Sequence, residues 1–318
     1  MRAPVPAGYT MRPADPADIS AIAAVGRACD LADFGEVDIS EDWLRDEWRR
    51  PRFDPTTDAW VVTAADGEVV AAASSWDEGA STIFDSAGSV HPGHRGRGVG
   101  AALARAVEVR AARDAAALPA GSAPRVHQVF DAANAGAHAL FEGLGYAPVR
   151  GFQHMQIEVG PGRLPGPEPH GIRIRPRADA DDPAIHAAAE EAFRNHWGFR
   201  PEPYEEWLDE WRSSGSYDPT LWLVATAGDE IVGAMLANLT EGRGWIGDLA
   251  VRDAWRRRGI GEALLRAAFA LFAERGVTTV MLNVDRDNTT GATRLYERAG
   301  MHVRRRWLVV AKTLTAAP

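Results

Sequence analysis

The sequence is poor in several residue types, and each shortage excludes a class of protein. Cys29 is the only cysteine among 318 residues. No disulfide can therefore form within the chain, and the fold does not depend on an oxidising compartment. Lys312 is the only lysine, and the net charge is −9. A nucleic-acid-binding surface is usually basic, so we expect no nucleic-acid partner.

Long apolar runs are absent as well. No stretch approaches the roughly 20 residues that a membrane span needs, and the first twenty residues contain no apolar segment of the signal-peptide kind. We therefore expect a cytoplasmic protein without a membrane partner. The content of 46% hydrophobic and 25% charged residues is typical of globular proteins. The length predicts about two domains, each large enough to bury its own core.

The most informative stretch follows a short apolar strand that ends at Val251. We call it the C-terminal cradle, and it consists of Arg256, Arg257, Arg258, Gly259, Ile260 and Gly261. Its glycines let backbone N–H groups approach a bound group closely. The helix predicted from Glu262 adds unpaired N–H donors and the positive end of its dipole. The R-x-x-G-x-G spacing differs from a P-loop and from a dinucleotide-binding turn, and it predicts a pyrophosphate site.

The same pattern occurs earlier in the chain. The N-terminal cradle comprises Val90, Arg95, Gly96, Arg97, Gly98, Val99 and Gly100. Four further pairs of segments match in the same order: 9–13 with 172–176, 53–56 with 217–220, 67–71 with 229–233, and 140–146 with 295–301. The chain therefore contains an internal repeat, with one copy in each half. We expect domains at 1–159 and 171–318, joined by a Pro/Gly-rich linker at 160–170.

Each half shows the same succession of predicted elements, β-α-α-β-β-β-α-β-α-β, which indicates a mixed α/β fold. The principal segments are a helix at 18–29, hairpins at 60–74 and 221–236, long helices at 101–112 and 262–275, buried strands at 126–130 and 280–284, and last strands at 152–159 and 307–313.

A second motif adds to the cradles. Residues 288–301, NTTGATRLYERAGM, resemble the N-x-x-[AG]-x-x-L-Y-x-x-x-G-F signature of the GNAT N-acetyltransferase superfamily. The cradles resemble the acetyl-CoA-binding loop of the same superfamily, and the resemblance covers almost the whole chain. It implies two tandem GNAT domains, each with a splayed mixed sheet flanked by helices. It also implies transfer of an acetyl group from acetyl-CoA to a primary amine of a small molecule. Mycothiol synthase is a tandem member of similar size.

The resemblance also implies roles for individual residues. The cradles would bind CoA, together with the strand residues Leu249, Ala250 and Val251. A backbone N–H at or beside Leu249 or Val251 would polarise the thioester carbonyl, and Asn288 would meet the pantetheine arm. Tyr296 would protonate the departing thiolate, because a tyrosine with its ordinary pKa of about 10 is protonated at pH 7.

The general base is less clearly indicated. Many members, including mycothiol synthase, have a glutamate on the strand before the cradle, at the position where this chain has Trp245. Asp248 lies on the same strand, on the opposite face of the sheet if the alternation is regular. Asp285 and a water relay are other candidates. In this superfamily the connection that holds His196 and Trp197 borders the acceptor cleft, so we expect these two residues and Trp245 to contact substrate.

The two halves differ at the acid position. Five residues after Gly291 stands Tyr296, whereas five residues after Gly136 stands Phe141, which has no proton to give. We therefore expect chemistry in the C-terminal half only. Two other functions stay open: acetylation of a cysteinyl pseudo-disaccharide, as in mycothiol synthase, and non-catalytic binding of acyl-CoA. His91 and His94, which lie between Val90 and Arg95, have no further ligand at metal-site spacing, so no metal is expected. A monomer and a homodimer fit equally well.

Overall fold

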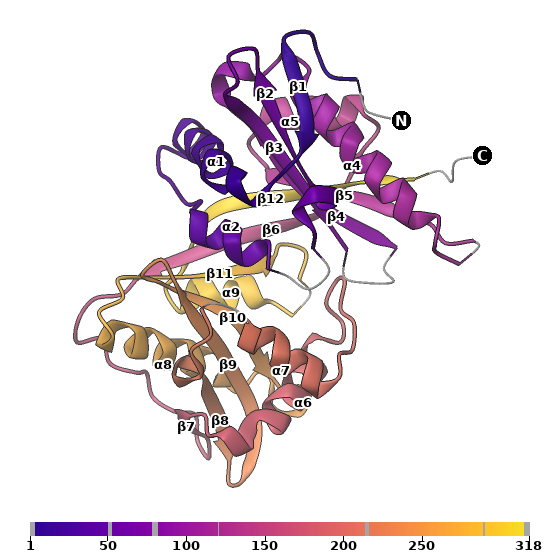
Figure 1. The fold of residues 1–318 in the computed structure, drawn as a ribbon. Helices are drawn as coiled ribbons and strands as arrows, with labels where there is room; N and C mark the ends of the chain where they lie inside the picture. The colour runs from indigo at the N-terminus through magenta and orange to yellow at the C-terminus, as the bar shows by residue number, and fades with distance from the viewer. Residues whose placement is uncertain are drawn as a thin grey trace. The chain divides into compact units, whose positions relative to one another are not determined.

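The computed structural model describes residues 4–49, 53–77, 82–119, 121–213, 216–288 and 290–314. The chain forms two compact units. Unit 1 comprises Met1–Gly151 with Trp307–Pro318, and unit 2 comprises Phe152–Arg306. Figure 1 shows that each unit has a sheet flanked by helices. No helix in the described ranges is long and apolar enough to cross a membrane.

Unit 1 holds the strands in the order β1-β2-β3-β4-β5-β12. Its elements are β1 (Tyr9–Pro13), α1 (Ile19–Phe34), α2 (Glu41–Glu47), α3 (Pro55–Asp58), β2 (Ala59–Ala64), β3 (Val69–Trp76), β4 (Ile83–Val90), α4 (Val99–Ala115), β5 (Arg125–Asp131), α5 (Ala135–Gly143) and the second part of β12 (His302–Thr313). One core packs α4 against the sheet through Leu103 and Val107, while α1 and α2 contribute Ala23 and Leu44 to a separate cluster.

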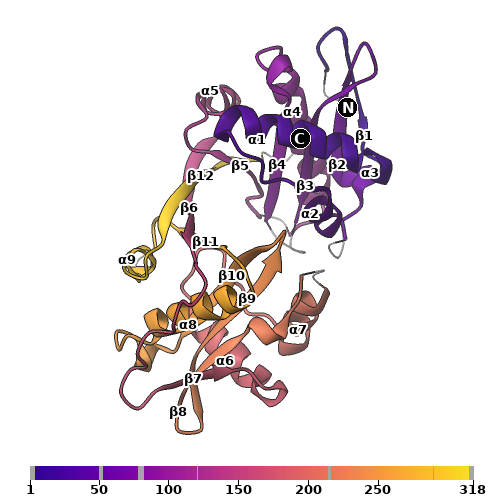
Figure 2. The same cartoon turned by 90° about the vertical axis from the view of Figure 1, so that its left-hand side faces the viewer.

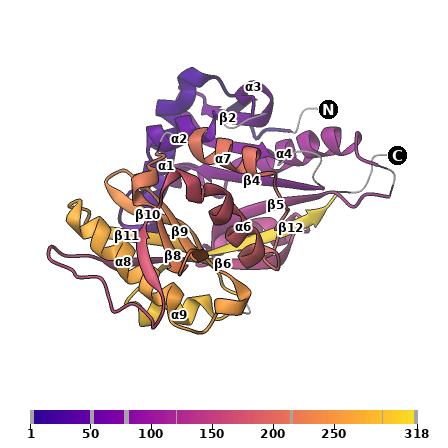
Figure 3. The same cartoon turned by 90° about the horizontal axis from the view of Figure 1, so that it is seen from below.

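Unit 2 repeats this order as β7-β8-β9-β10-β11-β6. Its elements are the second part of β6 (Ala147–Glu158), β7 (Arg173–Pro176), α6 (Asp182–Phe193), α7 (Tyr204–Ser213), β8 (Leu223–Ala227), β9 (Glu230–Thr240), β10 (Arg243–Val251), α8 (Ile260–Glu274), β11 (Thr279–Asp285) and α9 (Ala292–Arg298). The helices α6 and α7 lie together (Figure 2, Figure 3), and Ile185 and Trp207 join them to one core cluster. Leu264 of α8 and Tyr296 of α9 belong to another.

The last strand of each sequence repeat belongs to the other unit. The segments 152–159 and 307–313 were expected to be strands, and the structure confirms this. The strand at the end of the first repeat pairs with β11 from Phe152 opposite Asp285 to Glu158 opposite Thr279. The strand at the end of the second repeat pairs with β5, where Trp307 lies opposite Asp131. The sequence domains 1–159 and 171–318 thus describe the repeat, and the compact units differ from them by this exchange.

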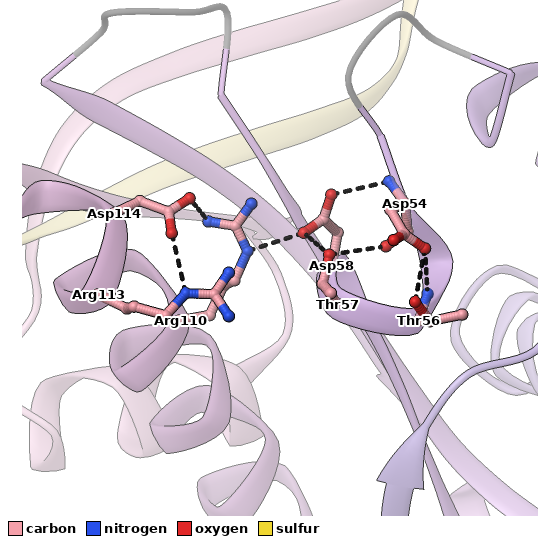
Figure 4. Close-up of polar contacts among 7 residues, drawn as sticks. All are labelled: Asp54, Thr56, Thr57, Asp58, Arg110, Arg113 and Asp114. Carbon is pink, nitrogen blue, oxygen red and sulfur yellow. Dashed lines mark hydrogen bonds and ion pairs between the residues drawn. The ribbon is translucent and has the colours of Figure 1, made fainter. Parts of the chain in front are cut away.

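Ion pairs hold equivalent segments of the two units in place. Arg110 of α4 donates through Nε to the buried Asp58 at 2.8 Å and also pairs with Asp114 (Figure 4). Asp54 caps the short helix that ends at Asp58, accepting a hydrogen bond from Thr56 N at 2.9 Å. In unit 2, Arg275 just after α8 pairs at 2.9 Å with Asp218, which is the counterpart of Asp54 and not of Asp58. These charged side chains join a helix to a loop, so we assign them a structural role.

Candidate active site

The two central strands of unit 2 diverge at their ends. Strands β10 and β11 are parallel and pair only from Gly244 opposite Val280 to Ile246 opposite Leu282. Beyond that point β11 offers no ladder partner to β10, whereas β9 stays paired with β10 as far as Val251. Strands β4 and β5 of unit 1 likewise pair at only two positions. Each unit therefore has the splayed sheet that the resemblance implies, with an opening beside the strand that leads to the cradle.

A β-bulge at Gly247 changes which side chains share a face. Asp248 lies opposite Leu236, which packs under α6 and α7, so Asp248 faces those helices. Trp245 lies opposite Asn238, two residues from Leu236, and so points to the same face. The expectation that Asp248 and Trp245 occupy opposite faces is wrong, because the extra residue in the bulge resets the alternation. A Cβ at position 247 would lie 2.8 Å from Trp211, which explains the glycine.

The charge of Asp248 acts on Tyr296, and both groups have raised pKa values. Burial is the main cause that raises the pKa of Asp248 to about 6, and the negative charge of Glu210 is the smaller cause. For Tyr296 burial is again the main cause, and together with the charge of Asp248 it raises the pKa to about 12. Asp248 can thus exchange a proton close to neutral pH, while Tyr296 stays protonated there. Asp285, the other candidate base, accepts a hydrogen bond from Asp287 N at 2.8 Å in the turn after β11.

The cradle has the shape of an anion site. Gly259 precedes α8 with φ +81°, and no side chain caps that helix. Its first N–H groups have no intrahelical acceptor and can receive a negatively charged group. Gly98 precedes α4 in the same way, with φ +82°. Gly261 lies against α9, because a Cβ there would be 3.1 Å from Leu295 Cδ2. The residues present therefore fit a pyrophosphate in both units.

The first arginine of each cradle is bonded to the strand before it. Arg256 donates through Nε to the Val251 carbonyl at 3.1 Å and through Nη2 to the Ala192 carbonyl at 2.9 Å. Arg95 makes the same Nε bond to Val90, at 3.1 Å, and pairs with Asp33. These contacts shape the loop. The other two arginines of the C-terminal cradle are largely exposed, and the Arg258 guanidinium lies 4.6 Å from the centre of the Trp255 ring.

The expected pantetheine and acceptor residues gather in unit 2. Asn288 Nδ2 lies 3.5 Å from His196 Nε2, and Asn288 Oδ1 accepts a hydrogen bond from Thr290 N. Thr289 of the same motif lies outside the described residues. The Trp245 ring contacts His154, with centroids 5.4 Å apart, and Trp197 contacts Phe152 at 6.0 Å. The sequence interpretation missed Phe152 and His154, because their strand comes from the end of the first repeat.

Unit 1 has no tyrosine at the corresponding place. Phe141 of α5 stacks on Phe130, with centroids 5.3 Å apart, and its edge meets Tyr146. Burial raises the pKa of Tyr146 far above its ordinary value, and this ring belongs to the core under α4. Phe141 therefore fills the space of Tyr296 without supplying a proton.

Comparisons with known proteins agree with this geometry. The Acetyltransferase (GNAT) family matches twice, at residues 28–146 and 183–301. A mycothiol acetyltransferase from Kineococcus radiotolerans is 33% identical over 308 residues, which cover 93% of this chain and 94% of the relative. The crystal structure of a GCN5-related N-acetyltransferase from Sphaerobacter thermophilus superposes with a TM-score of 0.88 at 36% identity, covering 98% and 97% of the two chains. A tandem GNAT protein from the clavulanic acid biosynthesis pathway shares the fold, with a TM-score of 0.72 at 18% identity and coverage of 98% and 99%. The chain therefore belongs to the GNAT family and is a tandem-domain, acetyl-CoA-dependent acetyltransferase.

Proposed function

We propose that the enzyme moves an acetyl group from acetyl-CoA to a primary amine of a small molecule, and that this chemistry takes place in unit 2. The observation that carries the proposal is that Asp248 lies on β10 just beyond its last pair with β11, at the opening between the two strands, and close enough for its charge to act on the buried Tyr296. Acyl transfer to an amine needs one group that accepts a proton and another that donates one. The pKa values of about 6 and about 12 suit these two tasks.

The C-terminal cradle and its neighbours would bind the donor. The uncapped N–H groups of α8 receive the pyrophosphate, while Asn288 lies at the pantetheine arm. A backbone N–H of β10 at or beside Leu249 or Val251 points towards the thioester oxygen, because β11 offers it no partner there. An N–H held in place before the reaction stabilises the charge that develops on that oxygen.

The proton transfers can be written from the residues present. Asp248 takes a proton from the substrate ammonium, directly or through one water. The neutral amine attacks the thioester carbon, the C–N bond forms, and the C–S bond breaks with its electron pair going to sulfur. Tyr296 donates its proton to that sulfur and regains one from water. General acid assistance of this kind is typically worth about 10²–10⁴-fold in rate.

A cysteinyl pseudo-disaccharide is a second candidate acceptor. The Kineococcus relative is a mycothiol acetyltransferase and matches nearly the whole chain, which favours this substrate. Trp245 speaks against an unchanged mechanism, because many members of the superfamily have a glutamate there. In this chain the bulge brings Asp248 to the same face, where it can replace that carboxylate. Trp197 and Trp245 offer apolar walls for either acceptor.

We further propose that the cradle of unit 1 also binds CoA but does not transfer acetyl groups, since Phe141 replaces the acid. A purely ligand-binding role for the whole chain is less well supported, because unit 2 keeps Tyr296.

The test is a screen for CoA release. Wild-type protein with acetyl-CoA is assayed against small-molecule amines, including amino acids, polyamines, aminoglycosides and the cysteinyl pseudo-disaccharide. We expect release with at least one amine and product acetylated on nitrogen. Tight CoA binding without release for any amine would instead support the ligand-binding role.

A further inference from the structure

The central strands of unit 1 part earlier than those of unit 2. The last β4 residue that pairs with β5 is Phe84, whereas β10 stays paired with β11 as far as Ile246. Val90 and Val251 end the two equivalent strands. The fifth pair back from that end holds Ser86 in unit 1 and Ile246 in unit 2. The opening of unit 1 therefore begins two residues lower along the strand, a difference of about 7 Å.

Polar side chains line this lower end of the opening, on the face under α4. Ser75 of β3 lies directly opposite Ser86, and Gln128 stands two residues after Val126, the last β5 residue that pairs with β4. Phe84 and Val126 belong to the core under α4, and side chains two residues apart on a strand share a face. Ser86 and Gln128 therefore point under α4. Ser75 points the same way, because directly paired residues lie on one side of a sheet.

The corresponding level of unit 2 is apolar. Ala237 and Leu282 are the ladder partners of Ile246 on its two sides, and they take the places of the serine of β3 and the glutamine of β5. Met301 takes the place of Tyr146 in the repeat. All four residues of unit 2 belong to one hydrophobic core cluster. The polar layer is thus particular to unit 1.

Two side chains of this layer have unmet hydrogen bonds. Ser75 is 1% exposed and Gln128 is 5% exposed. Among the described residues, neither the Ser75 hydroxyl nor the Gln128 amide nitrogen has a hydrogen-bond partner. Ser86 differs, because its hydroxyl donates to the His127 carbonyl at 2.6 Å across the gap between the strands. Burying a polar group without a partner is costly, so the two unmet donors mark a place for a bound oxygen.

The layer adjoins the place where the thiol end of a bound CoA would lie. Phe141 is the counterpart of Tyr296, which the proposed mechanism places beside the sulfur. The ring of Phe141 meets that of Tyr146, with centroids 5.3 Å apart. Burial is the main cause that raises the pKa of Tyr146, and the Gln128 amide lies near enough to lower it in part. Phe141 and Tyr146 thus connect the sulfur position with the polar layer.

The charges next to the layer cancel one another. Lys312 Nζ donates a hydrogen bond to Glu108 Oε1 at 2.9 Å and lies 5.6 Å from the centre of the Tyr146 ring. Because Lys312 is already paired, it would offset little of the cost of burying a carboxylate here. An uncharged oxygen avoids that cost and can accept from a hydroxyl and from an amide.

We propose that the opening of unit 1 binds an acyl-CoA whose acyl group carries an uncharged oxygen on its third carbon, with Ser75 and Gln128 as the residues that bind this oxygen. The inference rests on the proposed binding of CoA by the cradle of unit 1. The third carbon lies two bonds beyond the thioester carbon, and the additional depth of about 7 Å accommodates it. The site binds without transfer, since Phe141 gives no proton there.

Calorimetric titration at pH 7 compares acetoacetyl-CoA with butyryl-CoA, which has the same chain length but no oxygen on the third carbon. The full chain carries Gly259→Asp in every case, so that the cradle of unit 2 binds weakly, and no amine is added. CoA itself is titrated first, and its saturable binding tests the cradle of unit 1 separately from the acyl preference. We expect acetoacetyl-CoA to bind at least about tenfold more tightly than butyryl-CoA.

Three variants on this background assign the site, with thermal melting as the check on folding. The double variant Ser75→Ala, Gln128→Leu introduces the residues of unit 2 and should remove the preference for acetoacetyl-CoA, while CoA binds as before. Ser74→Ala changes the neighbouring serine, which points to the opposite face of β3, and should leave the preference unchanged. Gly98→Asp should weaken the binding of all three ligands, because it places a charge in the cradle of unit 1.

The outcomes separate the inference from the function on which it rests. An absence of saturable CoA binding would contradict the proposed cradle of unit 1 and the inference together. Normal CoA binding with equal affinities for acetoacetyl-CoA and butyryl-CoA would overturn the inference alone, since water would then satisfy the layer. A folded Ser75→Ala, Gln128→Leu protein that keeps the full preference would also overturn it.

Discussion

Replacing Gly259 by aspartate puts a negative charge into the predicted pyrophosphate site of unit 2. The backbone there has φ +81°, and a new Cβ would lie 3.7 Å from Pro169 Cγ, an ordinary contact. The left-handed conformation costs a non-glycine residue about 1–2 kcal/mol, and aspartate tolerates it better than most. Domains are typically stable by about 5–15 kcal/mol, so we expect Gly259→Asp to fold.

The charge should act on the donor substrate far more than on the fold. Two like charges about 4 Å apart repel by about 4 kcal/mol at an effective dielectric constant of 20. Allowing half of that for salt and rearrangement leaves about 2 kcal/mol, which corresponds to at least about a 30-fold rise in KM for acetyl-CoA. The assay is steady-state kinetics with acetyl-CoA varied, alongside thermal melting.

Two matched variants serve as controls. One separates the effect of the new charge from that of backbone strain, and the other compares the cradle of unit 2 with the cradle of unit 1. Gly259→Asn has the same strained backbone without the charge, so its KM should rise much less. Gly98→Asp places the charge in the cradle of unit 1, where φ is +82°, and should leave KM nearly unchanged. The reasoning is refuted if folded Gly259→Asp keeps a normal KM, or if Gly98→Asp causes the larger increase.

Three further predictions concern the base, the donor sites and the strand exchange. Because the pKa of Asp248 is about 6, kcat/KM should rise with pH through that value, and Asp248→Asn should lower it and flatten the profile. The pKa of Asp248 in the folded protein lies above the ordinary 3.8, so the free energy of unfolding falls as pH rises from 3.8 to 6. At pH 8 the free energy of unfolding of Asp248→Asn, measured with denaturant, should exceed that of the wild type by up to about 3 kcal/mol. Calorimetric titration with CoA should give two sites per chain; none would contradict the assignment of both cradles, and one would mean that a cradle is blocked. The fragment 171–318 lacks the strand that pairs with β11, so we expect it not to melt cooperatively when followed by circular dichroism. The fragment 152–306 contains that strand and should melt cooperatively. Cooperative melting of 171–318 alone would contradict the exchange of strands.

Local patterns predict most of the fold. Residues 101–112 and 262–275 read as helices from their composition, and the structure has Val99–Ala115 and Ile260–Glu274. Gly276 follows the second of these with φ +76°, a conformation that suits a glycine after a helix. The repeated Asp-Pro-Thr segments form short capped helices in both units, at Asp54 and Asp218. Periodicity and capping are properties of neighbouring residues, so one sequence is enough to find them.

Partner choice and register are less accessible from sequence. The residue pattern of 152–159 and 307–313 identifies strands but does not say which neighbour each one joins, so the exchange was missed. Gly247 lies in the bulge and close to Trp211, a contact that no local pattern records. For the same reason the joint position of Trp245 and Asp248, and the pKa of Asp248, emerge only from the structure.

The central claim is that acetyl transfer takes place in unit 2 with Tyr296 as the acid. Steady-state kinetics of Tyr296→Phe beside Phe141→Leu tests it most directly, because the two positions are equivalent in the repeat. We predict that Tyr296→Phe lowers kcat at least about tenfold with little change in CoA affinity, since water can replace the hydroxyl only in part. Phe141→Leu should leave kcat nearly unchanged. Full kcat in Tyr296→Phe, or loss of activity in a folded Phe141→Leu protein, would contradict the account.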